Sequence, residues 1–327
     1  MAHGSGGKSG AVLMANIFGK YFKNDILDKM EDAAVIDING KIAFSTDSFV
    51  VAPIQFKGGD IGKLSICGTV NDLAMMGAIP KYITCGFILE EGLSVDILEE
   101  IVKSMAKAAE EAGVLIVAGD TKVVEGSGGL YINTTGIGLI PKGRDVSAAN
   151  CEEGDVVILS GTLGDHHACI LSARMEIEND IESDCAVLSE IPEKLFAEGI
   201  VIKAMRDVTR GGLGTIINEI ANSSDCKIEL WETAIPVNPS VRGFADILGL
   251  DPMYMGNEGK MILVVKDEDS EKALSIIRET SVGKNAEIIG RVFDAKSDGQ
   301  PKVVKKTKLG GTTVVDVLYG EGLPRIC

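Results

Sequence analysis

The stretch SVDILEEIVKSMAKAAEEAGVLIVAGDTKVV, residues 94–124, contains the alternation that decides the fold. Ser94 is typical of a helix N-cap, and Gly113 is a residue type at which helices end. The apolar residues between them recur at helical spacing on one face, at Ile97, Leu98, Ile101, Val102, Met105 and Ala109. The apolar run over 114–118 then predicts a strand that ends just before the segment GDTK. A helix followed directly by a strand favours a layered α/β or α+β fold.

Strands and helices alternate along the rest of the chain as well. Before residue 94, the sequence predicts a short helix over 11–22, a hairpin of 33–38 with 41–44 that turns at Asn39-Gly40, a helix from Ile61 and a strand over 82–89. After residue 124, it predicts strands over 130–140, 155–159, 226–230, 261–265 and 286–292, and helices through 216–220 and over 241–248 and 270–277. The α/β (α+β layer) class therefore extends to the whole chain.

A boundary between two domains falls within residues 141–153, where Pro, Gly and charged residues cluster without an apolar period. A chain of 327 residues is also long enough for two domains. We therefore expect four parts: a glycine-rich segment and helix over 1–32, an N-terminal domain over 33–145, a C-terminal domain over 146–317 and a tail over 318–327. The tail has no apolar face, so we expect it to be mobile.

The charge balance disfavours some classes of function. The sequence has 32 Lys and Arg residues against 48 Asp and Glu residues, a net charge of −16, and only 5 % aromatic residues. Such a chain is poorly suited to neutralise the phosphates of a nucleic acid or to bind an anionic membrane. It has no run of about 18 apolar residues, no apolar signal-peptide core and no CxxC pair among its cysteines. We predict a cytoplasmic protein without nucleic-acid or membrane partners.

Acidic residues stand beside small polar residues at four places that we interpret as strand ends or turns. They are Asp47 in STDS, Asp72 directly after Asn71, Asp120 in GDT and Asp207 in RDVT. A carboxylate in such a place can ligate a hard cation such as Mg²⁺. A helix cap or an Asx-turn is the commoner explanation of any single Asp. The recurrence of one pattern at four places favours a shared magnesium site.

Two glycine-rich loops could present backbone N–H groups to phosphate. The first contains Gly4, Gly6, Gly7 and Lys8, and the second, TRGGLG, contains Thr209, Gly211 and Gly212. Neither loop has the GxxxxGK[ST] pattern or the GxGxxG pattern after a strand. Each loop is therefore weak evidence for nucleotide binding when taken alone.

Three further positions have side chains that could take part in chemistry. Lys122 could stabilise a transferred phosphoryl group, although an exposed lysine at a strand end explains its spacing more simply. Glu258, in the glycine turn MGNEGK, is either a general base or a turn residue. The pair His166-His167 is interpreted as a surface pair at the start of a helix rather than a set of metal ligands.

Cys327 is the last residue of the sequence, where the terminal carboxylate resists burial and disfavours a core role. Residues 318–327 span about 33 to 36 Å when extended, whereas a globule of this length has a radius of gyration of roughly 20 Å. The thiol could therefore reach its own active site and then a partner protein, as a swinging carrier arm does. An accidental terminal cysteine is the alternative.

Segments along the whole chain resemble the HypE family of hydrogenase maturation carbamoyl dehydratases, within the superfamily of aminoimidazole ribonucleotide synthetase and selenophosphate synthetase. They are HGSGG (3–7), STDSFVV (45–51), GTVNDLAMMGA (68–78), GDTKVV (119–124), RDVTRGGL (206–213), GNEGK (256–260) and, most specifically, PRIC (324–327). Selenophosphate synthetases have a reactive Cys or selenocysteine in the first segment, where this chain has Ser5. Selenide chemistry is therefore disfavoured.

The resemblance implies a two-domain aminoimidazole ribonucleotide synthetase-like fold whose N-terminal halves pair in a homodimeric barrel. It implies that ATP lies in a cleft bordered by both domains, under Gly4 to Lys8, with a contribution from the partner subunit. The implied magnesium and phosphate site contains Asp47, Asp72 and Asp207, and Asp120 also faces the nucleotide.

The resemblance also implies the reaction and the partners. Lys122 and Glu258 match positions near the reacting carbamoyl group, and Cys327 matches the carrier thiol. In this family a carbamoyltransferase, HypF, loads a carboxamide onto the thiol, ATP drives its dehydration to a thiocyanate, and the cyanide passes to iron on a HypC–HypD scaffold for nickel–iron hydrogenase. Two alternatives are an ATP-dependent synthetase or kinase acting on a free small molecule, and a degenerate scaffold that only recruits maturation partners.

Overall fold

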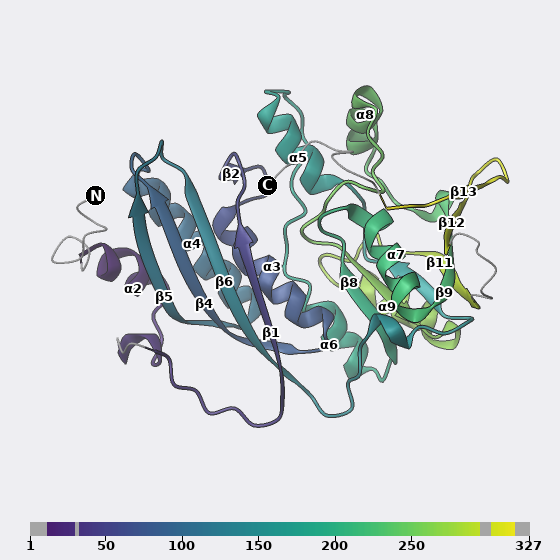
Figure 1. Cartoon of the computed structure of the whole chain (residues 1–327), viewed down its shortest axis with the longest axis horizontal. Helices are drawn as coiled ribbons and strands as arrows, with labels where there is room; N and C mark the ends of the chain where they lie inside the picture. The colour runs from purple at the N-terminus through teal and green to yellow at the C-terminus, as the bar shows by residue number, and fades with distance from the viewer. Residues whose placement is uncertain (1–11, 30–32, 295–301, 318–327) are drawn as a thin grey trace. The chain divides into compact units, whose positions relative to one another are not determined.

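The structure, a computed structural model, describes residues 12–29, 33–294 and 302–317. These residues form two compact units, each with its own sheet (Figure 1). The N-terminal unit contains the described residues up to Ala74 and Ala78–Lys142. The C-terminal unit contains Met75–Gly77 and the described residues from Gly143 onward.

The N-terminal unit is built on a four-stranded sheet with the strand order β1-β6-β4-β5. The strands are β1 (Lys41–Phe49), β4 (Ile79–Glu90), β5 (Leu115–Val124) and β6 (Leu130–Ile140). Strand β6 pairs antiparallel with β1 and β4, and β4 pairs parallel with β5. The parallel pair is joined by the helix α4 (Val95–Ala112), and α3 (Ile61–Met75) precedes β4. A short hairpin of β2 (Gln55–Phe56) with β3 (Gly59–Asp60) leads into α3.

Helix α4 is the element that the sequence predicts most completely. The Ser94 hydroxyl accepts the N–H of Asp96, and Gly113 ends the helix in the left-handed conformation with φ of 66°. The predicted apolar face is buried at Leu98, Ile101, Val102, Met105 and Ala109. A side chain at Gly62 of α3 would place its Cβ 2.4 Å from the Ile101 carbonyl oxygen, so α3 and α4 are in close contact. The expected helix is confirmed.

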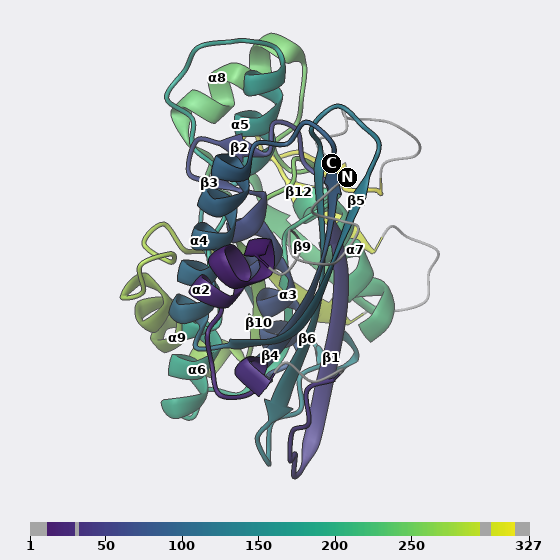
Figure 2. The same cartoon turned by 90° about the vertical axis from the view of Figure 1, so that its left-hand side faces the viewer.

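One face of the N-terminal sheet is covered and the other is exposed. Figure 2 shows α2 (Gly19–Tyr21), α3 and α4 on the same side of the sheet. Side chains on that side, such as Ile83 and Ile132, are buried. The opposite side has large apolar side chains that stay exposed in this chain, and we call it the bare sheet face: Ile42, Phe44, Ile88, Val124 and Tyr131. Such a face is unusual for a sheet that has no further partner.

Two expectations for the first fifty residues are wrong in part. Residues 33–38 form no strand, and Val35 is 83 % exposed. Strand β1 pairs instead with β6, from Lys41 opposite Ile140 to Phe49 opposite Ile132. This long-range pairing prevails over the local Asn-Gly turn because it buries Phe49 against α3. The short helix is a π-helical turn over Met14–Phe18 followed by α2.

The C-terminal unit has a seven-stranded sheet with the order β13-β12-β9-β11-β7-β10-β8. The strands are β7 (Val156–Leu159), β8 (Ile202–Asp207), β9 (Cys226–Trp231), β10 (Met261–Val265), β11 (Glu287–Asp294), β12 (Val303–Lys306) and β13 (Thr312–Val314). The helices are α5 (Asp165–Arg174), α6 (Glu190–Ala197), α7 (Gly212–Ser224), α8 (Pro239–Leu248) and α9 (Ser270–Arg278). The sequence did not predict α6, β8, β12 or β13, and of α5 it predicted only the start, at His166-His167.

The core of the C-terminal unit lies around its central strands. Every residue of β10 is buried, and Val157, Ile217, Ile228 and Ile262 are fully inaccessible to solvent. A continuous apolar strand of this kind is covered on both faces. The mixed α/β class expected from the sequence is confirmed in both units. Among the helices of the described residues, none is long and apolar enough to cross a membrane.

Candidate functional site

Two of the predicted magnesium ligands lie on the covered side of the N-terminal sheet. The Ser45 hydroxyl of β1 donates a hydrogen bond of 2.5 Å to the Asp72 carboxylate of α3. Phe49, four residues further along β1, packs against Gly68 of α3. Asp47 lies between Ser45 and Phe49 on the same side of the strand, because side chains on a strand alternate. Asp47 therefore lies within β1 and faces the same layer as Asp72.

The donor set at this place suits a hard cation. Asp47 and Asp72 offer carboxylate oxygens, and Asn71 precedes Asp72 on α3. Within the residues that the structure describes, no group of three or more His, Cys, Asp and Glu side chains could hold a metal ion. Mg²⁺ is usually bound through one or two carboxylates together with substrate phosphates and waters. Two carboxylates therefore fit a magnesium ion that enters with a nucleotide.

Asp120 and Lys122 lie on the opposite face of the same sheet. Both lie within β5, which runs to Val124, and not after a strand that ends at residue 118. Lys122 is in register with Ile88, a residue of the bare sheet face. The Lys122 ammonium donates a hydrogen bond to Asp120, which lowers the pKa of the Asp120 carboxyl. The N-terminal unit thus presents two predicted site residues on each face of its sheet.

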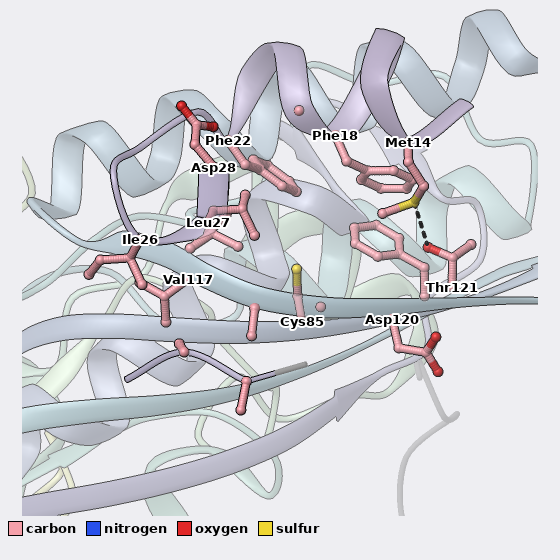
Figure 3. Close-up of a pocket in the computed structure, with 17 residues that line it drawn as sticks. Met14, Phe18, Phe22, Ile26, Leu27, Asp28, Cys85, Val117, Asp120 and Thr121 are labelled. Carbon is pink, nitrogen blue, oxygen red and sulfur yellow. Dashed lines mark hydrogen bonds between the residues drawn. The ribbon is translucent and has the colours of Figure 1, made fainter. Parts of the chain in front are cut away.

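A cavity of about 190 Å³ lies between β4, β5 and residues 14–28 and 33–34 of the N-terminal unit. Figure 3 shows Phe18, Phe22 and Cys85 turned into it, whereas the Asp120 carboxylate points away on the other side of β5. The Phe18 and Phe87 rings lie 4.8 Å apart, and burial raises the pKa of the Cys85 thiol to about 12. The cavity is therefore apolar, and the sequence patterns gave no sign of it.

The second glycine loop forms the start of a helix in the C-terminal unit. Strand β8 ends at Asp207, and α7 begins at Gly212, whose N–H bonds to the Thr209 carbonyl. Gly211 and Gly212 have φ of 79° and 60°. A Cβ at Gly212 would lie 2.6 Å from the Met253 carbonyl oxygen, so only glycine fits there. The N–H groups of Gly212 and Gly214 donate to the carbonyls of Thr209 and Met253, so a phosphate at this helix N-terminus would have to be held by other groups of the loop.

The Glu258 turn is bonded to the Asp207 loop. The N–H of Val208 donates to the Lys260 carbonyl, and the Asn257 N–H and side-chain amide both donate to the Val208 carbonyl. Asn257 is fully buried and also accepts the N–H of Gly164. The structure thereby brings Asp207, Thr209 and Glu258 into one region of the C-terminal unit.

The interpretation of His166-His167 as a surface pair is wrong. Both imidazoles are buried, and burial lowers the pKa of each to about 4. The His166 Nδ1 atom lies 2.8 Å from the Ser183 hydroxyl. The pair is buried because eight of the ten residues of α5 are covered by the surrounding unit. The polar character of its sequence concealed this burial.

A buried polar cluster surrounds the start of α5, and the sequence patterns missed it. The Asp165 carboxylate accepts hydrogen bonds from Thr162 and Asn238, and burial raises the pKa of that carboxyl. The participants come from segments more than seventy residues apart, as the Asn238 bond shows with a separation of 73. No local motif could have indicated the cluster. The predicted residues Gly4, Gly6, Gly7, Lys8 and Cys327 lie outside the described residues.

Comparison with known proteins identifies the family. Residues 30–140 match the model of the AIR synthase related protein, N-terminal domain, and residues 152–300 match that of the C-terminal domain. The carbamoyl dehydratase HypE of Rhodobacter capsulatus is 45 % identical over 335 residues, with 100 % of this chain and 97 % of that protein covered. The chain belongs to the HypE family of carbamoyl dehydratases.

Solved HypE structures share this fold. A HypE crystal structure in complex with ATP is 47 % identical, with a TM-score of 0.95 over 100 % of this chain and 99 % of that one. The HypE chain of a HypE–HypF complex is 46 % identical, with a TM-score of 0.81 over 94 % of this chain and 99 % of that one. The two-domain AIR synthase fold expected from the sequence motifs is confirmed.

Proposed function

We propose that this chain catalyses the ATP-dependent dehydration of an S-carboxamide, carried on Cys327, to a thiocyanate during maturation of nickel–iron hydrogenase. The observation that carries the proposal is full-length similarity, at 45 to 47 % identity, to HypE dehydratases, including one crystallised with ATP. The seven motifs of the resemblance supply the residues. A cytoplasmic location and the absence of nucleic-acid and membrane partners are part of the proposal.

The reaction balances without any other reagent. The carboxamide oxygen attacks the γ-phosphorus of ATP, ADP leaves, and a poor leaving group, oxide, becomes phosphate. The nitrogen loses both protons, the C–O bond breaks and phosphate departs, which leaves an S–C≡N group on the sulfur. The net products are thiocyanate, ADP, inorganic phosphate and one released proton.

Residues of both units are proposed to hold the nucleotide. Asp47 and Asp72, with Asn71 beside them, bind the magnesium ion, and Asp207 is the third proposed ligand. A Mg²⁺ ion held by these residues would supply positive charge to neutralise the phosphates. The backbone N–H of Gly211, beside Thr209, is proposed to donate to phosphate oxygens at the N-terminus of α7, while Gly212 gives the loop its turn. Gly4, Gly6, Gly7 and Lys8 are proposed to cover the nucleotide.

Two side chains are proposed to act on the carboxamide. Glu258 accepts an N–H proton, since a carboxylate within hydrogen-bond reach can act as a general base. Lys122 stabilises the negative charge that develops on the transferred group. Its ammonium is paired with Asp120 on an exposed strand, where it is available to a second molecule.

A homodimer accounts for the bare sheet face. Phe44 is 63 % exposed and Ile88 is 46 % exposed, so that face would lose apolar surface from water by pairing with a second copy. Asp120 and Lys122 lie on β5 of the same face. In a dimer that closes these sheets into a barrel, both residues would serve a site shared with the partner subunit. This explains why they lie opposite Asp47 and Asp72.

Each proposed partner takes part in one transfer of the carbon atom, either onto the Cys327 sulfur or away from it. A carbamoyltransferase of the HypF type supplies the carboxamide, as the HypE–HypF complex of the relative suggests. A HypC–HypD complex then accepts the cyanide on iron. Both encounters require the Cys327 sulfur to leave its own active site, which a carrier tail allows.

Mass spectrometry of the full chain tests the proposal. After incubation with HypF and its carbamoyl donor, Cys327 should gain one carboxamide, and addition of MgATP should then remove one water from the tail peptide. Cys226→Ala, which removes a buried thiol, is the matched control and should show both steps. The same two mass changes in Cys327→Ala would overturn the carrier role. ATP turnover on a free metabolite by Cys327→Ala would favour the synthetase alternative.

A further inference from the structure

The Asp184 carboxylate of the C-terminal unit binds three consecutive residues of the Glu258 turn. Its Oδ1 atom accepts the N–H of Glu258 at 3.1 Å, and its Oδ2 atom accepts the N–H of Gly259 at 3.1 Å. The Lys260 ammonium donates to Oδ2 at 3.2 Å. The Asp184 side chain is only 4 % exposed. A buried carboxylate with three donors is strongly fixed in its geometry.

The backbone of Glu258 is held on its other side as well. The N–H of Ala186 donates to the Glu258 carbonyl oxygen at 3.4 Å. Both backbone polar groups of Glu258 therefore bond to the segment 184–186. A Cβ at Gly259 would lie 1.8 Å from the Asp184 carbonyl oxygen, so the two segments touch without room for a larger residue. This contact leaves the Cα of Glu258 little freedom.

Catalysis by a general base depends on the position of that base. A proton acceptor must lie within hydrogen-bond reach of the proton, and a displacement of about 1 Å can cost on the order of a hundredfold in rate. A turn that contains two glycines, Gly256 and Gly259, is flexible unless something fixes it. Asp184 supplies a charged acceptor at the two N–H groups where the turn changes direction.

We propose that Asp184 is a positioning residue for the dehydration step, which fixes the Glu258 turn so that the Glu258 carboxylate meets the carboxamide nitrogen. The inference rests on the proposed function, in which Glu258 is the base. Asp184 acts through the backbone of Glu258 and Gly259 and not on the substrate. Its contacts join residues that are 74 and 75 positions apart in the sequence.

The test is a single-turnover experiment with the full chain, loaded with the carboxamide on Cys327 and mixed with saturating MgATP. Asp184→Asn keeps the shape of the side chain but offers only one acceptor to the two N–H groups. We expect the rate of water loss to fall by about tenfold or more, with the KM for ATP and the loading by HypF unchanged. A wild-type rate in Asp184→Asn would overturn the inference.

Asp155→Asn is the matched control. Asp155 is also buried in the C-terminal unit, and its carboxylate accepts one backbone N–H, that of Glu152, at 2.8 Å. The structure gives it no bond to the Glu258 turn among the described hydrogen bonds. We expect its dehydration rate to stay within about twofold of wild type. A loss equal to that of Asp184→Asn would assign both effects to general destabilisation and overturn the positioning role.

A double-mutant cycle separates positioning from a structural role. If Asp184 acts through Glu258, then Asp184→Asn should cause no further loss of rate in a Glu258→Gln chain. An equal loss in both backgrounds would overturn the inference. Wild-type protein without any ATP-dependent water loss would instead overturn the proposed function. If Glu258→Gln lowers the rate of dehydration but Asp184→Asn leaves it at the wild-type value, only the Asp184 inference is overturned.

Hydrogen exchange in the wild-type chain decides the question if Asp184→Asn does not fold. The amides of Glu258 and Gly259 should then exchange as slowly as those of the buried strand β10, because Asp184 accepts both. Exchange at the rate of an open loop would overturn the proposal.

Discussion

His166 and His167 show how strongly burial sets the chemistry of a single residue in this protein. The pKa of each imidazole falls from 6.5 to about 4, mainly because burial penalises the charged form. Both side chains are therefore neutral at pH 7 in the folded chain. His167 Nε2 is the one buried side-chain nitrogen or oxygen of the described residues without a hydrogen-bond partner.

The stability of the protein should depend on pH through these histidines. A folded-state pKa below the unfolded value of 6.5 means that the unfolded chain binds the proton more tightly. The stability that each neutral imidazole contributes is present above pH 6.5 and is lost as the pH falls towards 4. We expect each histidine to contribute a slope of up to about 1.4 kcal/mol per pH unit in this window.

The measurement is chemical unfolding of wild type and His167→Leu between pH 7 and 4. The variant should show a shallower fall in the free energy of unfolding, because leucine does not titrate and leaves no unpaired buried nitrogen. Identical slopes for the two proteins would contradict the burial of His167. His166 keeps its own contribution in both proteins.

Residue-scale predictions from sequence succeeded where the signal was local. Ser94 caps α4 as predicted, because an N-cap bond reaches only two residues along the chain. Asp120 and Lys122 were predicted to follow a strand that ends at residue 118. That prediction was wrong, because β5 continues through both residues. Asp184 gave no signal at all, because its partners lie on a distant turn.

At the scale of elements, the helix α7 depends on the conformation of the two glycines before and at its start. Gly211 and Gly212 both have positive φ values, of 79° and 60°, and Gly212 is packed against Met253 and Tyr254. These glycines turn the chain sharply from β8 into α7. The proposed phosphate contacts need that turn, because it places the N-terminus of α7 directly after β8.

Gly212→Ala should destabilise the protein and weaken nucleotide binding. The added Cβ would lie 2.6 Å from both the Met253 carbonyl oxygen and the Tyr254 carbonyl carbon, in a conformation that alanine rarely adopts. We expect a loss of about 2 kcal/mol or more in the free energy of unfolding. Chemical unfolding and ATP titration measure the two effects.

Gly243→Ala is the control for this prediction. Gly243 lies within α8, and a Cβ there would meet no atom within 4 Å. Alanine in an open helical position should stabilise the chain by up to about 1 kcal/mol and leave ATP binding unchanged. Equal destabilisation by both variants would contradict the steric argument at Gly212.

Elements were predictable to the extent that they show an apolar period. Helix α4 shows such a period, strand β10 is a continuous apolar run, and both appear at the predicted places. Helix α5 is buried on all sides and shows no amphipathic face, so no period marked it. The expected hairpin of 33–38 with 41–44 does not form. The Asn-Gly signal concerns only the two residues of the turn, whereas β1 pairs with the strand that gives it the larger buried face, which is β6.

At the scale of the whole molecule, the bare sheet face is the feature on which the proposed homodimer rests. Phe44 of β1 and Ile88 of β4 stay exposed in the single chain, on the face that also has Lys122. Obligate dimer interfaces resemble a protein core divided in two. The proposed shared active site therefore requires the proposed homodimer.

Phe44→Asp should dissociate the dimer and abolish dehydration. A charge placed within an apolar interface loses its hydration without gaining a partner. Analytical ultracentrifugation should show a shift from dimer to monomer, with a loss of ATP-dependent water release from the tail. Ile247→Asp, at a side chain of α8 that is 84 % exposed, is the control and should leave both unchanged. A dimeric, active Phe44→Asp protein would remove this face from the interface.

By itself, the sequence determined the family and the layered α/β class. Its motifs and apolar periods are patterns among neighbouring residues, so they can be recognised without the three-dimensional structure. Only the tertiary structure decided that Asp47 and Asp72 lie on one side of the sheet while Lys122 lies on the other, and that Asp184 bonds to the Glu258 turn. These facts depend on strand register and on contacts between segments far apart in the chain. Their energy comes from burial and hydrogen bonding that exist only after folding.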